Sequence, residues 1–389
     1  MKQMIEAFYE QFGSGGDIQS FFAPGRVNLI GEHTDYNGGH VFPCALSVGT
    51  YAAARKRSDA KLRLYSMNFP ELGMIEADLS ALVYEQEQEW ANYPKGVAAK
   101  IREAGYPLSE GADIAYYGNI PNGAGLSSSA SIELVTGVVL DAFAGLDIDR
   151  VELVKLAQAA ENEFVGVNCG IMDQFAIGKG EKDHALLLNC QTLEYQKTPI
   201  HLEEETLVIA NTNKRRGLAD SKYNERRREC EEALEQLKTE LEAVYLGDIS
   251  VEDFEAYKHV IDDPVTRKRA KHVIYENART IEAVQKLNAG DISGFGRLMN
   301  ESHRSLRDDY EVTGHELDAL VEAAWEEGAV GSRMTGAGFG GCTISIVPKA
   351  DIETFKENVG EQYYKQTGLE ADFYVVEIGD GAKRLEEEE

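Results

Sequence analysis

The chain has 389 residues, of which 43% are hydrophobic and 27% charged, as in an ordinary globular protein with enough apolar side chain for a sizeable core. Its formal net charge of -28 argues against nucleic acid or an anionic membrane as the main partner, because both favour clustered Lys and Arg. The five cysteines are scattered without a CxxC pair or metal-ligand spacing, so we expect a reducing, cytoplasmic setting. The sequence contains no run of 18 apolar residues, which is the length that would suggest a membrane span.

The predicted elements begin with an amphipathic helix over residues 1–13. Runs rich in β-branched and aromatic residues predict strands at residues 51–56, 113–120, 185–190, 206–212, 343–348 and 373–378. Apolar residues at helical spacing predict helices at residues 128–145, 152–164, 224–244, 279–298 and 317–325. Strands come first and helices later, which favours an α+β protein of two domains, residues 1–200 and 201–389.

Residues 23–39, APGRVNLIGEHTDYNGG, gather Arg26, Glu32, His33 and Asp35 in a glycine-bounded segment. Neighbouring sugar hydroxyls need both acceptors and donors, and carboxylates that bind them discriminate between epimers. This density of polar groups therefore indicates recognition of a polyol. A surface loop with solvated charges is the simpler alternative.

Residues 121–131, PNGAGLSSSAS, place two glycines and three serines before a predicted helix. The glycines let backbone N–H groups converge on an anion, and the helix adds the positive end of its dipole. The serine hydroxyls suit phosphate oxygens or Mg²⁺. The alternative is a glycine turn with a serine N-cap. The Walker-type pattern GxxxxGK[ST] is absent from the sequence.

Two further stretches are weaker signals on their own. In residues 161–176, Glu161 and Asp173 are separated by Gly166 and Gly170, so a turn could bring the two carboxylates together. One could then hold a metal while the other meets a substrate hydroxyl, although most such residues are surface charges. Residues 331–348, GSRMTGAGFGGCTISIVP, form a glycine-rich loop before a strand, which could approach a ligand or be only a tight turn.

Together these four stretches resemble the motifs of the GHMP kinase family, and GRVNLIGEHTDYNGG resembles the signature of its galactose-phosphorylating members. WANYPKGV at Trp90 and LRDDYEVTGHELD at Leu306 are similar to the same members, so the resemblance spans nearly the whole chain. It implies a two-domain α+β GHMP kinase fold with the active site in the cleft between the domains. It also implies ATP with Mg²⁺, and phosphoryl transfer to the anomeric hydroxyl of galactose.

The resemblance also implies roles for individual residues, carried over by position. Asp173 matches the catalytic aspartate and Arg26 the arginine beside it. Tyr223 joins Arg26, Glu32, His33, Asp35 and Asp173 as sugar contacts, and Ser129 and Glu161 match the magnesium ligands. The residues implied for ATP are Gly123, Ala124, Gly125, Leu126, Ser127, Ser128 and Ser129 for the triphosphate, and Trp90 and Asn68 near the adenine.

Three alternatives stay open at this point. A kinase of another sugar would share every motif. A non-catalytic sugar sensor would be expected to carry a damaged phosphate loop, whereas GLSSSAS is complete and Asp173 is present. A mevalonate-type kinase would lack GEHTDYNGG. The expected partners are small molecules, galactose and ATP, and the expected assembly is a monomer or weak oligomer.

Overall fold

The computed structural model describes residues 2–121, 124–214 and 219–386. Its helices are α1 (Lys2–Phe12), α2 (Asn92–Glu103), α3 (Ser128–Ala144), α4 (Arg150–Ala159), α5 (Met172–Lys179), α6 (Ala219–Leu237), α7 (Val251–Tyr257), α8 (Pro264–Asn288), α9 (Ile292–Ser305), α10 (His315–Glu326) and α11 (Ile352–Thr367). Its strands are β1 (Gln19–Asn28), β2 (His40–Val41), β3 (Pro43–Lys56), β4 (Lys61–Ser66), β5 (Ile75–Asp78), β6 (Ala112–Gly118), β7 (His184–Asn189), β8 (Tyr195–Pro199), β9 (Glu205–Asn211), β10 (Gly331–Thr335), β11 (Cys342–Pro348), β12 (Asp372–Val376) and β13 (Lys383–Arg384).

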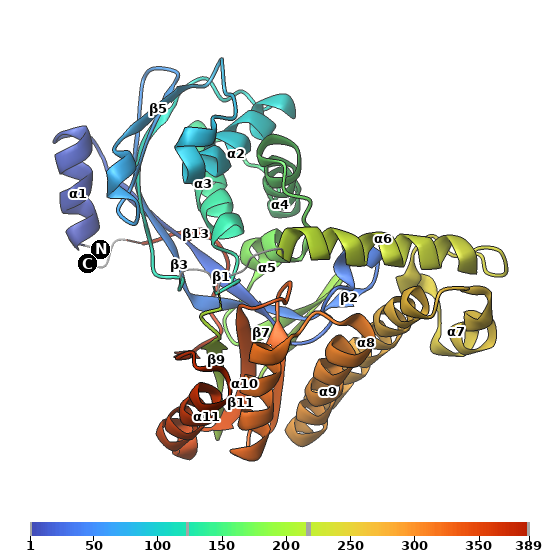
Figure 1. Ribbon diagram of the computed structural model, residues 1–389. Helices are drawn as coiled ribbons and strands as arrows, with labels where there is room; N and C mark the ends of the chain where they lie inside the picture. The colour runs from blue at the N-terminus through green and yellow to red at the C-terminus, as the bar shows by residue number, and fades with distance from the viewer. Residues whose placement is uncertain (1, 122–123, 215–218, 387–389) are drawn as a thin grey trace.

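Among the described residues the first lobe, here called the N-terminal lobe, is built on a six-stranded sheet in the order β13-β1-β3-β6-β4-β5. Its strands pair antiparallel, apart from β4 and β6, which run parallel. Helices α2 to α5 pack their apolar side chains on one face of this sheet. Helix α1 packs on the other face through Met4, Phe8 and Phe12, so the sheet is covered on both sides (Figure 1).

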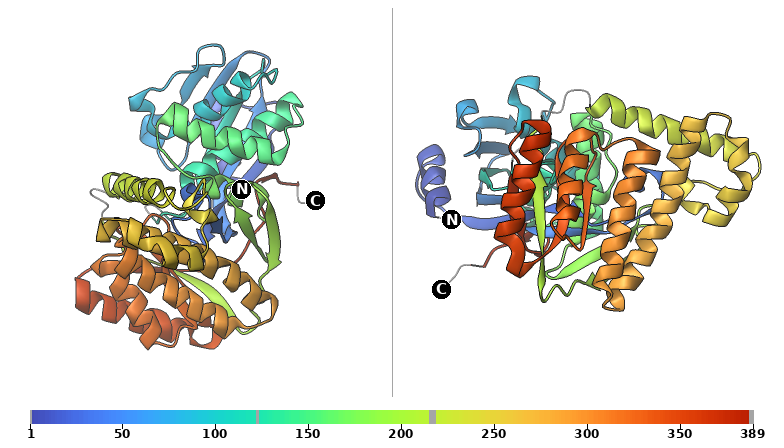
Figure 2. Two further views of the ribbon diagram at one scale, coloured as in Figure 1. Left: turned by 90° about the vertical axis from the view of Figure 1, so that its right-hand side faces the viewer. Right: turned by 60° about the horizontal axis from the view of Figure 1, so that its bottom comes forward.

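The second lobe, here called the C-terminal lobe, holds a four-stranded antiparallel sheet in the order β10-β11-β9-β12. Helices α10 and α11 cover one face of it. Apolar side chains of α8 and α9 reach the opposite face, where a short sheet in the order β2-β7-β8 joins the two lobes. Figure 2 shows the two lobes from two further directions, with α6 to α9 forming a helical layer beside the sheet.

Strand β1 contains only the beginning of the first motif, residues 23–28, whereas Glu32, His33 and Asp35 follow the strand. Its residues from Phe21 onward are buried, so β1 lies inside the sheet and not at the surface. The register against β3 shifts between Pro24 and Arg26, which marks a β-bulge. A bulge bends a strand and redirects a side chain, and here it turns Arg26 toward the second motif. Gly25 is required at this point because a Cβ there would lie 2.8 Å from the carbonyl oxygen of Leu126.

The six predicted strands are confirmed, and so are the helices predicted at residues 1–13, 128–145 and 317–325. The helix predicted at residues 152–164 continues beyond α4 as a π-helical turn, η4 (Ala160–Val165). The helix predicted over residues 279–298 is confirmed except for a break at residues 289–291. There α8 ends and α9 begins, because Gly290 adopts a left-handed backbone and Asp291 caps the next helix.

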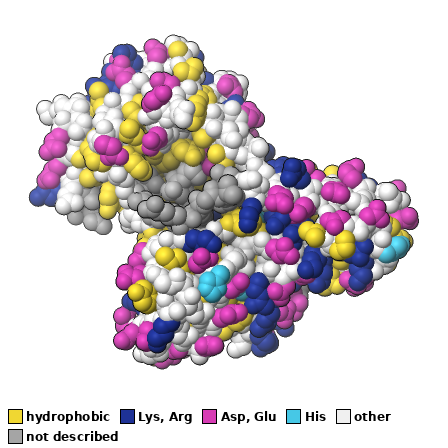
Figure 3. Space-filling model, viewed as in Figure 1, with side chains coloured by type: hydrophobic (Ala, Val, Ile, Leu, Met, Phe, Trp, Pro, Cys, Tyr) yellow, Lys and Arg dark blue, Asp and Glu magenta, His cyan; other side chains and the backbone are white. Residues whose placement is uncertain are grey.

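The division into residues 1–200 and 201–389 stays a prediction. The strand β13 lies beyond residue 200 but pairs with β1 of the N-terminal lobe, so the chain crosses back between the lobes near its end. None of the helices in the described ranges combines the length and apolar character needed to cross a bilayer. On the face in Figure 3, acidic side chains are spread over both lobes with basic ones between them.

Candidate active site

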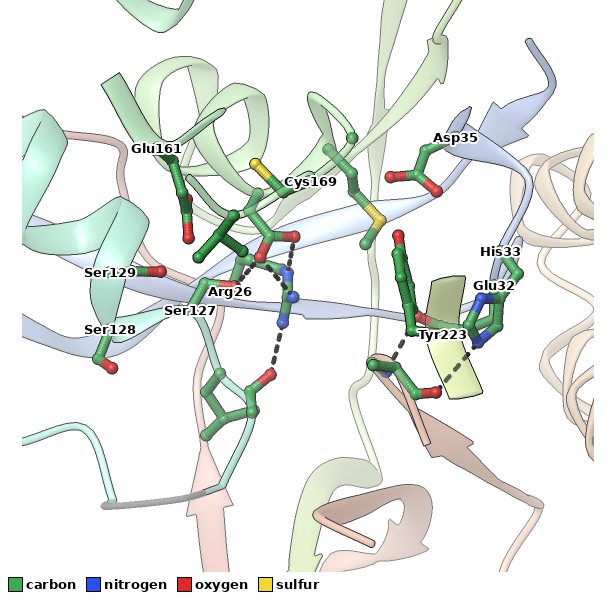
Figure 4. Close-up of a pocket in the computed structure, with 18 of the residues that line it drawn as sticks. Arg26, Glu32, His33, Asp35, Ser127, Ser128, Ser129, Glu161, Cys169 and Tyr223 are labelled. Carbon is green, nitrogen blue, oxygen red and sulfur yellow. Dashed lines mark hydrogen bonds and ion pairs between the residues drawn. The ribbon is translucent and has the colours of Figure 1, made fainter. Parts of the chain in front are cut away.

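A single pocket is lined by residues of all four motifs. Its walls come from both lobes, and the close-up in Figure 4 shows the labelled residues around it. The predicted site residues that line it are Arg26, Glu32, His33, Asp35, Gly125, Leu126, Ser127, Ser128, Ser129, Glu161, Asp173 and Tyr223. Segments from distant parts of the sequence therefore converge, as the resemblance implies.

Arg26 is the centre of this arrangement. Its Nε donates to Asp173 Oδ1 and its Nη2 to Asp173 Oδ2, both at 2.7 Å, which is a bidentate ion pair. Its Nη1 donates to the carbonyl oxygen of Gly125 at 2.8 Å, and its backbone N–H donates to Leu126 at 3.1 Å. Burial alone would lower the pKa of Arg26, but the charge of Asp173 raises it, so the guanidinium stays charged. Arg26 thus connects the carboxylate to the glycine-serine loop.

The glycine-serine loop ends where α3 begins at Ser128, as predicted. Ser127 has a left-handed backbone with φ of 62°, which is strained for a residue with a Cβ. Its hydroxyl donates to Asp173 Oδ2 instead of capping the helix, so the simple N-cap interpretation is wrong for this side chain. Ala124 is fully buried, and Gly123 lies outside the described residues.

Glu161 and Asp173 approach each other, as the turn between them was expected to allow. Burial and the charge of Asp173 raise the pKa of Glu161 to about 7, although hydrogen bonds from Ser129, Cys169 and Gln174 act in the opposite direction. Behind them, Gln174 Nε2 donates to Glu161 Oε2 at 2.7 Å and to Glu133 Oε2 at 3.0 Å. Burial, followed by the charge of Glu161, raises the pKa of Glu133 well above its ordinary value.

This side of the pocket fits a divalent cation. Burial and neighbouring carboxylates raise the pKa of both Glu161 and Glu133, and Glu133 Oε1 is buried without a partner among the described residues. Within that part of the chain, no three His, Cys, Asp or Glu side chains are grouped to hold a metal by themselves. Mg²⁺ commonly takes one or two protein ligands and completes its shell with phosphates and water. The hydroxyl of Ser129 and the carboxylate of Glu161 match that pattern.

The other end of the pocket contains the residues predicted to contact a sugar. Glu32 Oε2 accepts from Arg333 Nη2 at 2.6 Å, and its Oε1 accepts from the Gly336 backbone N–H at 2.9 Å. Burial, followed by the charge of Asp173, raises the pKa of Asp35 to about 7. The ring of Tyr223, on α6, lies 5.7 Å from the ring of His33. Acceptors, a ring and backbone groups therefore surround this end, as polyol recognition requires.

The residues predicted near the adenine line a second pocket, which shares Ser128 and Ser129 with the first. Trp90 is 8% exposed and packs edge-on against Tyr116 at 5.6 Å. Asn68 is less available, because its side-chain amide already exchanges two hydrogen bonds with the backbone of Gly118, at 2.9 and 2.7 Å. Together the two pockets give a continuous lining from an aromatic wall, past the serines, to the carboxylates.

Several residues of the site were not predicted from the sequence. Arg333 lies in the fourth stretch, and its guanidinium is fully buried against Glu32 and the carbonyl oxygen of Asn28. A lone arginine before a glycine loop carries no signal that it reaches the first motif. Gly170 was noticed only as a turn residue, yet a Cβ there would lie 1.8 Å from Asp35 Oδ2. Gln174, beside the predicted catalytic aspartate, received no role.

Comparison with known proteins agrees with this geometry. The chain matches the family model of the galactokinase galactose-binding signature over residues 6–56, the GHMP kinases N terminal domain over residues 92–181 and the GHMP kinases C terminal over residues 281–365. It is 57% identical to a galactokinase of Fusobacterium nucleatum, covering 99% of this chain and 100% of the relative. It is also 57% identical to a galactokinase of Bacillus subtilis, covering 98% of each.

Among solved structures, Lactococcus lactis galactokinase complexed with galactose matches with a TM-score of 0.96 and 49% identity over 99% of both chains. Mevalonate kinase of Methanococcus jannaschii matches with a TM-score of 0.64 at 18% identity, covering 94% of this chain and 99% of that one, a likeness of fold alone. With the signature, both GHMP domains and relatives of full length in agreement, this chain belongs to the galactokinase family of GHMP kinases.

Proposed function

We propose that this chain transfers the γ-phosphoryl group of ATP to the C1 hydroxyl of α-D-galactose and releases galactose 1-phosphate, the first committed step of the Leloir pathway. The observation that carries the proposal is the Arg26–Asp173 ion pair. It is bonded to the glycine-serine loop through Gly125 and Ser127, and it lies in the pocket that also holds Glu32 and Asp35. A phosphate loop and a polyol site thus meet at one carboxylate.

Phosphoryl transfer depends on positioning and charge neutralisation more than on covalent work by the protein. The backbone N–H groups after Gly125 and the start of α3 would hold the triphosphate, and Trp90 would pack near the base. Ser129 and Glu161 would hold Mg²⁺, which neutralises phosphate charge when it is bound. The charged Arg26 would add to that neutralisation from the opposite side of the loop.

Asp173 would accept the proton of the sugar hydroxyl. Its Oδ2 accepts from both Arg26 and Ser127, whereas the bond from Arg26 Nε leaves a lone pair on Oδ1. The hydroxyl is a poor nucleophile, so an adjacent proton acceptor lowers the barrier. The competing interpretation is that Arg26 favours the alkoxide by its charge and Asp173 only positions the sugar.

The test is ADP release across a panel of sugars, with and without Mg²⁺, for the parent and for Asp173→Asn. We expect galactose to be preferred, turnover to need Mg²⁺, and Asp173→Asn to lower kcat by roughly a hundredfold or more. The exposed Asp262→Asn, remote from the pocket, is the matched control and should behave as the parent. Near-normal turnover by folded Asp173→Asn would show that Asp173 does not act as the general base.

The same panel decides between the alternatives. Preference for another hexose would make the chain a kinase of that sugar. Galactose and ATP binding without turnover would indicate a sensor. A cytoplasmic location and a monomeric or weakly oligomeric state, with galactose and ATP as the partners, stay predictions of the sequence.

A further inference from the structure

A chain of buried hydrogen bonds runs behind the sugar end of the pocket. His33 Nδ1 lies 2.8 Å from the hydroxyl of Tyr36, and that hydroxyl lies 2.8 Å from the hydroxyl of Tyr310. The thiol of Cys230 lies 3.2 Å from the same Tyr310 hydroxyl. Tyr310 ends η7 (Leu306–Tyr310), a π-helical turn within the LRDDYEVTGHELD stretch to which no role has yet been given.

The donor and the acceptor in each hydrogen bond of this chain follow from the contact that the other ring nitrogen of His33 makes. His33 Nε2 lies 3.2 Å from the carbonyl oxygen of Ala337, and a carbonyl can only accept, so Nε2 carries a proton. Burial and the nearby His272 lower the pKa of His33 to about 3, so the ring is neutral and Nδ1 must accept.

With Nδ1 as an acceptor, the rest of the chain is fixed. Tyr36 donates to His33, Tyr310 donates to Tyr36, and the thiol of Cys230 donates to Tyr310. Each hydroxyl has one proton to give, so reversing a single bond would leave two acceptors facing each other. The structure thus specifies one tautomer of His33, with hydrogen on Nε2.

This tautomer has a consequence for the pocket. Ala337 follows Gly336, whose N–H bonds Glu32, so the His33–Ala337 bond is a second connection between the first motif and the glycine loop of the C-terminal lobe. His33 also has a left-handed backbone with φ of 64°, which needs support from its neighbours. Both of its ring nitrogens are bonded to the protein, so its influence on a sugar is one of position.

We propose that Tyr36 and Tyr310 are positioning residues of the acceptor site, whose hydroxyls set the Nε2–H tautomer of His33 and thereby hold the Ala337 carbonyl and the Tyr223 ring at the sugar. The rings support this arrangement, because Tyr310 lies 4.9 Å from His33 and Tyr36 lies 5.3 Å from Tyr223. This inference rests on the proposed function for the identity of the sugar. The hydrogen-bond chain and the tautomer of His33 do not depend on it.

The first arm of the test reads the tautomer directly. Nitrogen NMR of ¹⁵N-histidine-labelled parent protein at pH 7, assigned by the signals lost in His33→Gln, should show a protonated Nε2 and a bare Nδ1. A protonated Nδ1, or a cationic ring, would overturn the proposal without any variant of the tyrosines. In Tyr36→Phe the Nδ1 signal should move, because its donor is gone.

The second arm separates positioning from general stability. Tyr36→Phe should raise KM for the sugar roughly tenfold, the value of about one hydrogen bond, with KM for ATP and kcat within about twofold. Tyr310→Phe should act in the same direction and less strongly, because Tyr36 keeps its own proton. Tyr363→Phe is the matched control, since it removes another buried hydroxyl, bonded to Thr212 at 2.7 Å in a different core.

The outcomes are distinct. If Tyr36→Phe changes the sugar KM no more than Tyr363→Phe at a similar loss of Tm, the tyrosines are only structural and the proposal fails. If Tyr36→Phe does not fold, the tautomer of the parent and the KM of Tyr310→Phe decide. If the parent prefers a sugar other than galactose, the proposed function fails, and the same KM comparison is made with that sugar.

Discussion

Three residues with left-handed backbones, His33, Ser127 and Phe339, belong one each to the first, second and fourth stretches. Such backbones cost free energy and persist only where the surroundings enforce them. The enforcing contacts are visible here, since His33 is held at both ring nitrogens and the Phe339 N–H donates to Val312 at 2.7 Å. Three of the nine non-glycine residues with positive φ in the described chain thus lie in the segments that carry the site.

At the residue scale, Gly170→Ala should damage the sugar end alone. The new Cβ would overlap Asp35 Oδ2, so the carboxylate must move, and we expect KM for galactose to rise roughly tenfold or more with KM for ATP unchanged. Steady-state kinetics for both substrates measures this. Gly360→Ala in α11 is the matched control, because its Cβ would make only ordinary contacts with Phe373 of β12. An unchanged galactose KM in folded Gly170→Ala would contradict the close packing seen here.

The raised pKa of Asp35 predicts a pH dependence with a definite sign. Its ordinary value is 3.8 and its value in the folded chain is about 7, so between these pH values the unfolded chain loses a proton that the folded chain keeps. The free energy of unfolding should therefore fall as pH rises from about 4 to about 7. Asp35→Asn lacks this contribution, so urea unfolding should show the variant gaining stability relative to the parent over that range. If the variant instead gained stability relative to the parent as pH falls toward 4, folding would lower the pKa of Asp35 and not raise it.

At the scale of elements, the junction of α8 and α9 depends on a single cap. Asp291 Oδ1 accepts from the Gly294 N–H at 2.7 Å, just after the left-handed Gly290. Asp291→Ala should lower the free energy of unfolding by about 1 kcal/mol, with the kinetic constants unchanged because the junction is outside both pockets. Urea denaturation measures this. The exposed Glu357→Ala on α11 is the control and should stay within about 0.5 kcal/mol of the parent.

Local pattern was enough to predict β3, β6, β7, β9, β11 and β12, but it failed for β1, where tertiary packing decides. β1 contains Pro24 and Gly25, which indicate a turn locally, yet burial and the bulge make this stretch a strand. In the site, the glycine and serine motifs were enough to predict which loops line the pocket. Arg333 and Gln174 gave no signal, because their roles come from partners 301 and 13 residues away in the sequence.

At the scale of the whole molecule, the net charge of -28 should make the folded chain sensitive to salt. Like charges repel across a compact surface, and salt of about 0.15 M screens them beyond roughly 8 Å. We expect Tm to rise by a few degrees between low salt and that concentration, since about 1 kcal/mol corresponds to a few degrees for domains of this size. Calorimetry in a salt series measures this, and a falling Tm would show that the surface ion pairs outweigh the repulsion.

The pairing of β13 with β1 has a consequence for how the molecule is made. Phe21 and Phe22 pair with Arg384 and Lys383, which are synthesised more than 350 residues later. Until then, this part of the outer edge of β1 has no partner strand. An unpaired strand edge is a template for association with other chains. The nascent N-terminal lobe therefore keeps this part of the edge exposed until residues 383–384 pair with Phe21 and Phe22.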